Sequence, residues 1–82
     1  MNINVNQEII IYPTEQGWKE IHRLLENKFL FYGMLEIDVQ EYINKHTYNN
    51  GYKDQLWQIM YDFGKLFFNG SDFVTAKITF IE

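Results

Sequence analysis

Cysteine is absent from the chain, which excludes disulfide bonds and thiolate-bound zinc and leaves packing to hold the core. This absence fits a reducing compartment such as the cytoplasm. Long apolar runs are absent too, because no segment approaches the ~20 apolar residues that span a bilayer. The Asn-rich start lacks the basic and apolar regions of a signal peptide. We therefore expect a soluble, unprocessed cytoplasmic protein with no membrane contact and one domain, residues 1–82.

Residues that catalyse reactions or bind metals are scarce. His22 and His46 are the only histidines, and neither is accompanied by a cysteine or a close cluster of carboxylates at the spacing of a metal site. Ser71, the only serine, follows Asn69–Gly70 in a predicted turn, where serine is common for conformational reasons. The five glycines stand singly, so they form no phosphate-binding loop. We expect no enzymatic activity, no cofactor and no metal.

Basic residues are few as well. Seven lysines and arginines are scattered among eleven acidic residues, which gives a net charge of −4, and they form no cluster that could follow a phosphate backbone. Direct binding of nucleic acid is therefore disfavoured. Aromatic residues, in contrast, make up 18% of the chain, which favours a folded domain over disorder.

The densest apolar stretch runs from Tyr52 to Phe68 and predicts the central helix. Large side chains recur there at the three- and four-residue steps of one helical face, with Tyr52 extending a stripe made of Leu56, Ile59, Met60, Phe63 and Phe67. We expect this face in the core. Trp57, Tyr61 and Phe68 lie off the stripe and need cover from the chain or from a partner. Because Gly64 breaks the pattern, the helix is secure only as far as Phe63.

Near both ends of the chain, residues alternate between apolar and polar, which is the pattern of a strand with one buried and one solvent-exposed face. The first such segment, Asn2 to Tyr12, is strongest over Glu8–Tyr12, and Asn6–Gln7 could instead mark a bend; its apolar positions are Ile3, Val5, Ile9 and Ile11. Pro13 ends this strand. In the second segment, Phe73 to Ile81, the face expected to be buried holds Val74, Ala76, Ile78 and Phe80.

Two further helices are predicted by their N-terminal caps. Thr14 is suited to cap the first, and the apolar face of that helix holds Trp18, Ile21, Leu25 and Phe29. Gly17 in its first turn indicates either a weak start or close packing of another backbone. Asp38 and Glu41 form a capping box for a second helix, which ends near Lys45.

Together these elements predict a small α+β domain. Two strands alone are marginal in water, so we expect the N- and C-terminal strands to pair in a small antiparallel sheet packed against two or three helices. A third strand could come from residues 29–36 or 65–68, and residues 29–32 could equally be a helix end. Asn50–Gly51 and Asn69–Gly70 are suited to turns with positive φ.

Surface recognition is the function that the composition leaves open. Tyr48, Tyr52, Trp57 and Tyr61 occupy turn or off-stripe positions among polar residues, and they are of the types enriched at binding hot spots. They form either a protein interface or ordinary intramolecular packing. Glu36, Asp38 and Glu41 are the densest acidic group and would add charge to such a surface, although helix capping explains two of them.

Two stretches, Ile10–Ile21 and Leu56–Gly64, resemble the small accessory proteins of bacteriophages and other mobile elements. The resemblance lies in a strand followed by Thr-Glu-x-Gly-Trp, and in a Leu-Trp helix that ends in Phe-Gly. It implies a phage accessory role in the cytoplasm of the bacterial host. It also implies binding and inhibition of a host protein such as a defence nuclease, as anti-CRISPR proteins do. No catalytic residue is implied.

Two alternatives belong to other classes of function. One is a small-molecule or nucleotide binder, a sponge, with a pocket between helices. The other is a self-assembling structural protein or homodimer in which Trp57 and Tyr61 are buried at a two-fold interface.

Overall fold

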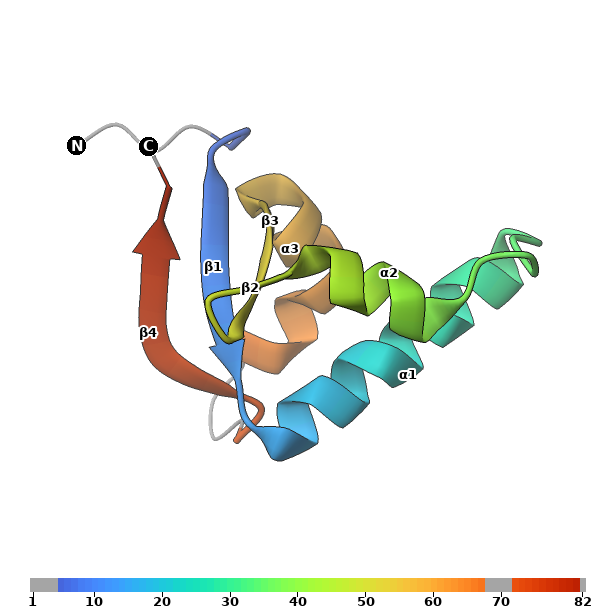
Figure 1. The fold of residues 1–82 in the computed structure, drawn as a ribbon, viewed down its shortest axis with the longest axis horizontal. Coiled ribbons are helices and arrows are strands. Elements are labelled where there is room, and N and C mark those ends of the chain that lie inside the picture. The colour runs from blue at the N-terminus through green and yellow to red at the C-terminus, as the bar shows by residue number, and fades with distance from the viewer. Residues whose placement is uncertain (1–4, 68–71, 82) are drawn as a thin grey trace.

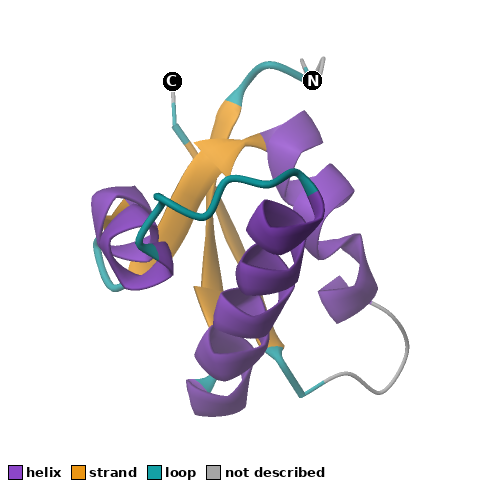
Figure 2. Ribbon diagram, turned by 90° about the vertical axis from the view of Figure 1, so that its right-hand side faces the viewer, coloured by secondary structure: helices purple, strands orange, loops and turns teal. Residues whose placement is uncertain are grey.

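Four antiparallel strands, in the order β2-β3-β1-β4, form the sheet of this chain in a computed structural model that describes residues 5–67 and 72–81 (Figure 1). The helices pack in front of one face of the sheet in Figure 2. In chain order the elements are β1 (Glu8–Pro13), α1 (Glu15–Phe31), α2 (Val39–His46), β2 (Thr47–Tyr48), β3 (Gly51–Gln55), α3 (Leu56–Phe63), the 3-10 helix η1 (Gly64–Phe67) and β4 (Val74–Phe80). The predicted α+β class is confirmed.

The two terminal strands pair as predicted, with β1 in the middle of the sheet. β1 lies between β3 and β4, and its residues Ile9 and Ile11 face Phe80 and Ile78 of β4 across the ladder. The third strand was predicted in the wrong place, because it is Gly51–Gln55, followed in the sheet by the short β2. Residues 29–31 end α1 and residues 65–67 belong to η1, while residue 68 lies outside the described chain.

The central helix is shorter than predicted at its N-terminal end. Tyr52 lies in β3 opposite Ile11, so pairing with a distant strand outweighs the helical spacing that Tyr52 shares with Leu56. The helix α3 ends at Phe63 as expected. Met60 was predicted in the core, but 52% of it is exposed. Phe68 lies outside the described residues.

Two strand predictions also need correction. The chain turns at residues 5–6, so the bend at Asn6–Gln7 is confirmed as the better interpretation, and Val5 is 59% exposed instead of buried. Ile3 lies outside the described residues. On β4, Ile78 and Phe80 are 42% and 37% exposed, because the helices contribute their core side chains over β1 and β3, and β4 packs mainly on β1.

Local capping signals are confirmed. The Thr14 hydroxyl oxygen accepts a hydrogen bond from the Gly17 N–H at 3.1 Å, and the Asp38 carboxylate accepts from the Glu41 N–H at 3.1 Å. A Cβ at Gly17 would overlap the carbonyl group of Phe73, which confirms close backbone packing as the reason for this glycine. Phe73, the residue before β4, therefore packs its backbone directly against the first turn of α1.

The turn between β2 and β3 differs from the predicted one by one residue. Asn49 and Asn50 have φ values of 50° and 66°, whereas Gly51 is already in β3. Both central residues of a tight hairpin turn need positive φ, which asparagine tolerates. Gly51 is required for space, because a Cβ there would overlap Ile10 and the Ile11 carbonyl oxygen. The predicted turn Asn69–Gly70 lies outside the described residues.

Candidate protein-binding surface

The aromatic residues predicted to bind a partner are distributed over separate parts of the fold. Trp57 and Tyr61 lie one turn apart on α3, 45% and 70% exposed. Trp57 donates its backbone N–H to the Val5 carbonyl at 3.0 Å and its indole N–H to the Gln55 side chain at 2.7 Å. Tyr48 lies on β2, 48% exposed, with the Lys53 ammonium 4.6 Å from its ring centre. The structure therefore does not gather these side chains into one surface.

Tyr52 was predicted both to extend the core stripe and to bind a partner; it is fully buried, which agrees with the first prediction and not with the second. Its ring stacks on the His46 imidazole with centroids 5.3 Å apart and meets Phe63 edge-on at 5.1 Å. Its hydroxyl is buried without a hydrogen-bond partner among the described residues, and burial raises the pKa of this phenol. Tyr52 thus contributes to the core, where it cannot reach a partner protein.

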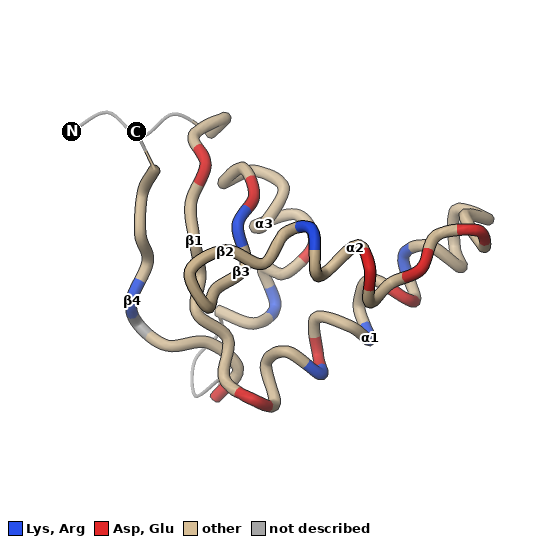
Figure 3. The backbone as a smooth tube through the Cα atoms, in the orientation of Figure 1, with Lys and Arg blue, Asp and Glu red and all other residues tan. Residues whose placement is uncertain are grey.

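The acidic group does come together, around a shallow pocket at the start of α2. Glu36, Asp38 and Glu41 line this pocket with Tyr42 and Lys45. Asp38 is occupied by capping α2, and Glu41 lies 3.7 Å from the Lys45 ammonium. Acidic and basic residues are interspersed along α1 and α2 in Figure 3. Lys45 therefore balances one of the three carboxylates, and the capping hydrogen bond engages a second.

A larger groove, which sequence reasoning missed, lies between α1 and the α3–η1 segment; we call it the α1–α3 groove. Its volume is about 620 Å³. Four large apolar or aromatic side chains that line it are exposed: Phe31 (82%), Tyr61 (70%), Tyr32 (56%) and Met60 (52%). Contiguous exposed side chains of this kind mark interaction sites on soluble proteins.

An ion pair joins the two sides of the groove. The Lys28 ammonium on α1 donates to both Asp62 carboxylate oxygens on α3, at 3.0 and 3.2 Å. Gln58 also donates to Asp62, at 2.7 Å, and the Asp62 side chain is only 4% exposed. Lys28 and Asp62 thus compensate each other, so this part of the groove presents mainly apolar surface, whereas the exposed Lys65 adds a cation to the lining.

Two tyrosines from the two helices line the groove. Tyr61 of α3 lies close enough to Tyr32, at the end of α1, to raise the pKa of Tyr32. Both side chains remain exposed. They therefore offer two aromatic surfaces to a partner.

The groove was missed for two reasons. Phe31 and Tyr32 lay in a segment that could be a helix end or a strand, and Met60 belonged to the stripe predicted as core. One signal was available: Leu24 and Phe31, seven residues apart on α1, flank the buried face that holds Ile21, Leu25 and Phe29. Apolar residues that widen a helical face in this way indicate a second contact surface.

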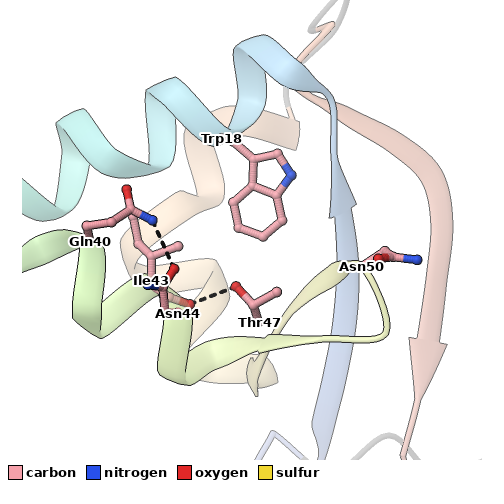
Figure 4. Close-up of a pocket in the computed structure, with 6 residues that line it drawn as sticks. All are labelled: Trp18, Gln40, Ile43, Asn44, Thr47 and Asn50. Atoms are coloured by element: carbon pink, nitrogen blue, oxygen red, sulfur yellow. Dashed lines mark hydrogen bonds between the residues drawn. The ribbon is translucent and has the colours of Figure 1, made fainter.

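A separate pocket of about 470 Å³ opens between α1, α2 and the hairpin (Figure 4). It is lined by Trp18, Gln40, Ile43, Asn44, Thr47 and Asn50. Gln40 bonds Asn44 at 3.0 Å, and the Thr47 hydroxyl donates to the Ile43 carbonyl at 2.8 Å. These lining residues are uncharged, so they provide no cation for the phosphate of a nucleotide.

Comparisons with protein-family models, with curated proteins and with solved structures find no match to this chain. Within residues 5–67 and 72–81, no three His, Asp or Glu side chains form a group that could hold a metal ion. In the same part of the chain, no helix has the length and apolar character needed to cross a membrane.

Proposed function

We propose that this chain is a non-enzymatic protein-binding domain whose α1–α3 groove takes up an amphipathic helix of a partner protein. The observation that carries the proposal is the exposure of Phe31, Tyr32, Met60 and Tyr61 along one groove. Water around such side chains is released when a partner covers them, and aromatic residues in this setting are typical binding hot spots.

The shape of the groove favours a helix as its occupant. Two helical segments form its walls, and a third helix laid between them can pack its apolar residues at i, i+3, i+4 and i+7 against both. Gly64 lines one wall, and apart from its chain neighbours and the backbone of its own helix, no described atom lies within 4 Å of the place where its Cβ would be. That open space lets a side chain of the incoming helix approach the η1 backbone closely.

The pairing of Lys28 with Asp62 supports an apolar contact face on the partner. A charged side chain buried beside this pair would lose its hydration without gaining a free counter-charge, while the exposed Lys65 of the same groove offers a cation to an acidic residue at the edge of that face. The resemblance to phage accessory proteins extends the proposal. We infer that the partner is a host protein, such as a defence nuclease, which is bound and inhibited in the bacterial cytoplasm.

Site-specific photo-crosslinking tests the occupant directly. A photoreactive phenylalanine analogue at Phe31 should crosslink to one helix of a single host protein, whereas the same analogue at Tyr48 should not. Crosslinks to an extended segment, or equal crosslinking from both positions, would contradict the proposal.

Affinity measurements with the captured partner test the groove itself. Tyr61→Ala and Phe31→Ala should each weaken the dissociation constant by about 30-fold, the effect of losing a hot-spot side chain. Trp57→Ala is the matched control, since Trp57 lies one turn earlier on α3 and does not line the groove; it should change the constant less than about threefold. Unchanged binding by folded Tyr61→Ala and Phe31→Ala would refute the site.

A further inference from the structure

The outer edge of β4 is a second unoccupied feature of the fold. β4 forms one end of the strand order, and no strand among the described residues pairs with its far side (Figure 1). An unpaired edge presents backbone N–H and C=O groups to any strand that can match them. The opposite end of the sheet is β2, which has only two residues, so β4 is the edge long enough to add a strand.

The exposed side chains of β4 make this edge apolar on the helix side. Ile78 and Phe80 are opposite the buried Ile11 and Ile9 of β1, yet they are 42% and 37% exposed. Ile78 and Phe80 therefore extend the apolar face of the sheet past the area that the helices cover. Another strand placed along β4 would cover both.

The hydrogen-bond pattern shows which backbone groups point outward. The Ile81 N–H donates to the Glu8 carbonyl at 3.0 Å, so Ile81 and, two residues before it, Thr79 direct their backbone groups towards β1. Because these directions alternate along a strand, the backbone groups of Ile78 and Phe80 face the open edge. The two residues with exposed apolar side chains are thus also the two with outward backbone groups.

We propose that β4 pairs with β4 of a second copy of this chain, forming a two-fold dimer with one continuous eight-stranded sheet (two sheets of four strands). A strand can pair antiparallel with itself about a two-fold axis, which gives a closed dimer. With the axis at Thr79, Ile78 of each copy lies opposite Phe80 of the other. All four exposed apolar side chains are then paired with one another.

Lys77 and a bulge select this register. The pairing of β1 with β4 is irregular between Ile11 and Pro13, so the part of β4 before Lys77 is not straight. An axis at Lys77 would place two ammonium groups directly opposite each other, which is unfavourable. With the axis at Thr79, the two Lys77 positions are about 13 Å apart along the strands, beyond the screening length at physiological salt.

Charge does not oppose this pairing. Lys77 is the only charged residue of β4, and its ammonium lies 4.8 Å from the centre of the Tyr12 ring, on the face away from Ile78. In Figure 3 the β4 tube carries one basic segment, and the acidic residues lie elsewhere. The strand itself therefore brings no acidic side chain to the two-fold axis.

Disulfide trapping tests both the dimer and its register, because the chain has no cysteine of its own. Thr79→Cys should form a covalent dimer under mild oxidation, since directly opposite positions have Cα atoms within the 4.4–6.8 Å that a disulfide spans. Lys77→Cys should crosslink at least tenfold more slowly, and Thr75→Cys should not crosslink above the rate of random collision. Equal rates for Thr79→Cys and Thr75→Cys would overturn the proposal.

Sedimentation of the unmodified chain provides the second test. At several hundred micromolar its mass should approach twice the 10.0 kDa of one chain, and Ile78→Asp should raise the dimer dissociation constant at least tenfold. Ile78→Thr, a milder change that suits a strand, guards against misfolding and should raise it in the same direction. Tyr61→Ala should leave it unchanged. A monomer at all concentrations, or a dimer sensitive to Tyr61 and not to Ile78, would refute the β4 interface.

Discussion

The ammonium group of Lys28 lies 3.0 Å from Oδ1 of Asp62, and this pair joins α1 to α3 at the base of the α1–α3 groove. Asp62 is nearly inaccessible to water and Lys28 is 26% exposed. The geometry of the proposed binding site therefore depends on one partly buried ion pair.

Asp62→Asn tests this dependence. The substitution removes the negative charge and leaves the Lys28 ammonium partly buried without its partner, so the free energy of unfolding should fall by about 2 kcal/mol. Urea denaturation would measure the change. Glu41→Gln is the control, because the exposed Glu41–Lys45 pair should contribute less than about 0.5 kcal/mol. Equal effects of the two substitutions would contradict a structural role for the Lys28–Asp62 pair.

Gly17→Ala and Gly64→Ala should change stability in opposite directions. A Cβ at Gly17 would overlap the Phe73 carbonyl group, whose oxygen accepts the Thr14 N–H at 2.8 Å and cannot move freely. We expect a loss of about 1 to 3 kcal/mol there. Gly64 has helical dihedral angles (φ −55°, ψ −31°) and open space around the Cβ position, so alanine should stabilise the protein by about 0.5 kcal/mol. Thermal unfolding would measure both changes, with the melting temperature expected to fall for Gly17→Ala and to rise for Gly64→Ala.

Tyr52→Phe tests the buried hydroxyl. Because this group has no partner among the described residues, its removal should leave the free energy of unfolding at pH 7 unchanged or raise it by up to about 1 kcal/mol. A loss of more than about 1 kcal/mol would show that the hydroxyl makes a stabilising contact.

The same variant should alter the response to alkaline pH. Burial raises the pKa of Tyr52 in the folded protein, so the phenol ionises more readily in the unfolded chain, and stability falls as the pH rises above about 10. By pH 11 the parent protein should lose about 1.4 kcal/mol more than Tyr52→Phe. Some loss should remain in the variant, because burial also raises the pKa of Tyr42. Parallel pH profiles for the two proteins would contradict this assignment.

Asn50→Ala should destabilise the hairpin, whereas Asn50→Gly should not. The φ of 66° at Asn50 is left-handed, which costs alanine about 1 to 2 kcal/mol and glycine almost nothing. In a domain of this size the alanine variant should melt about 5 °C or more below the parent protein. Equal melting temperatures for the two variants would show that the turn adapts to alanine.

The local parts of this fold could be predicted from the sequence. Thr14 and Asp38 cap helices by accepting hydrogen bonds from residues in the first turn, so a few neighbouring residues are enough to predict where each helix begins. The pairing of the terminal strands also followed, because Ile9 and Ile78 both lie in alternating segments. Tyr52 was wrongly assigned to the central helix because its strand partner Ile11 is distant in sequence. The spacing of apolar residues within residues 52–68 contains no information about pairing with β1.

The binding surface could be predicted only in part. The positions of Trp57 and Tyr61 off the apolar stripe left open whether the chain covers them, and the structure leaves them 45% and 70% exposed. The groove needed more than this, since Phe31 and Met60 come together only through the packing of α1 against α3. Burial of Tyr52 likewise depends on cover from both His46 and Phe63.

The hydrogen bond between the Glu8 carbonyl and the Ile81 N–H has a consequence for the order of folding. β1 is synthesised before its partner β4, so the central strand keeps one edge open until β4 has also been synthesised. Contacts between such distant segments slow folding, and open edges favour aggregation. Slow synthesis of the segment between β1 and β4 would therefore prolong the stage at which this domain is most vulnerable to aggregation.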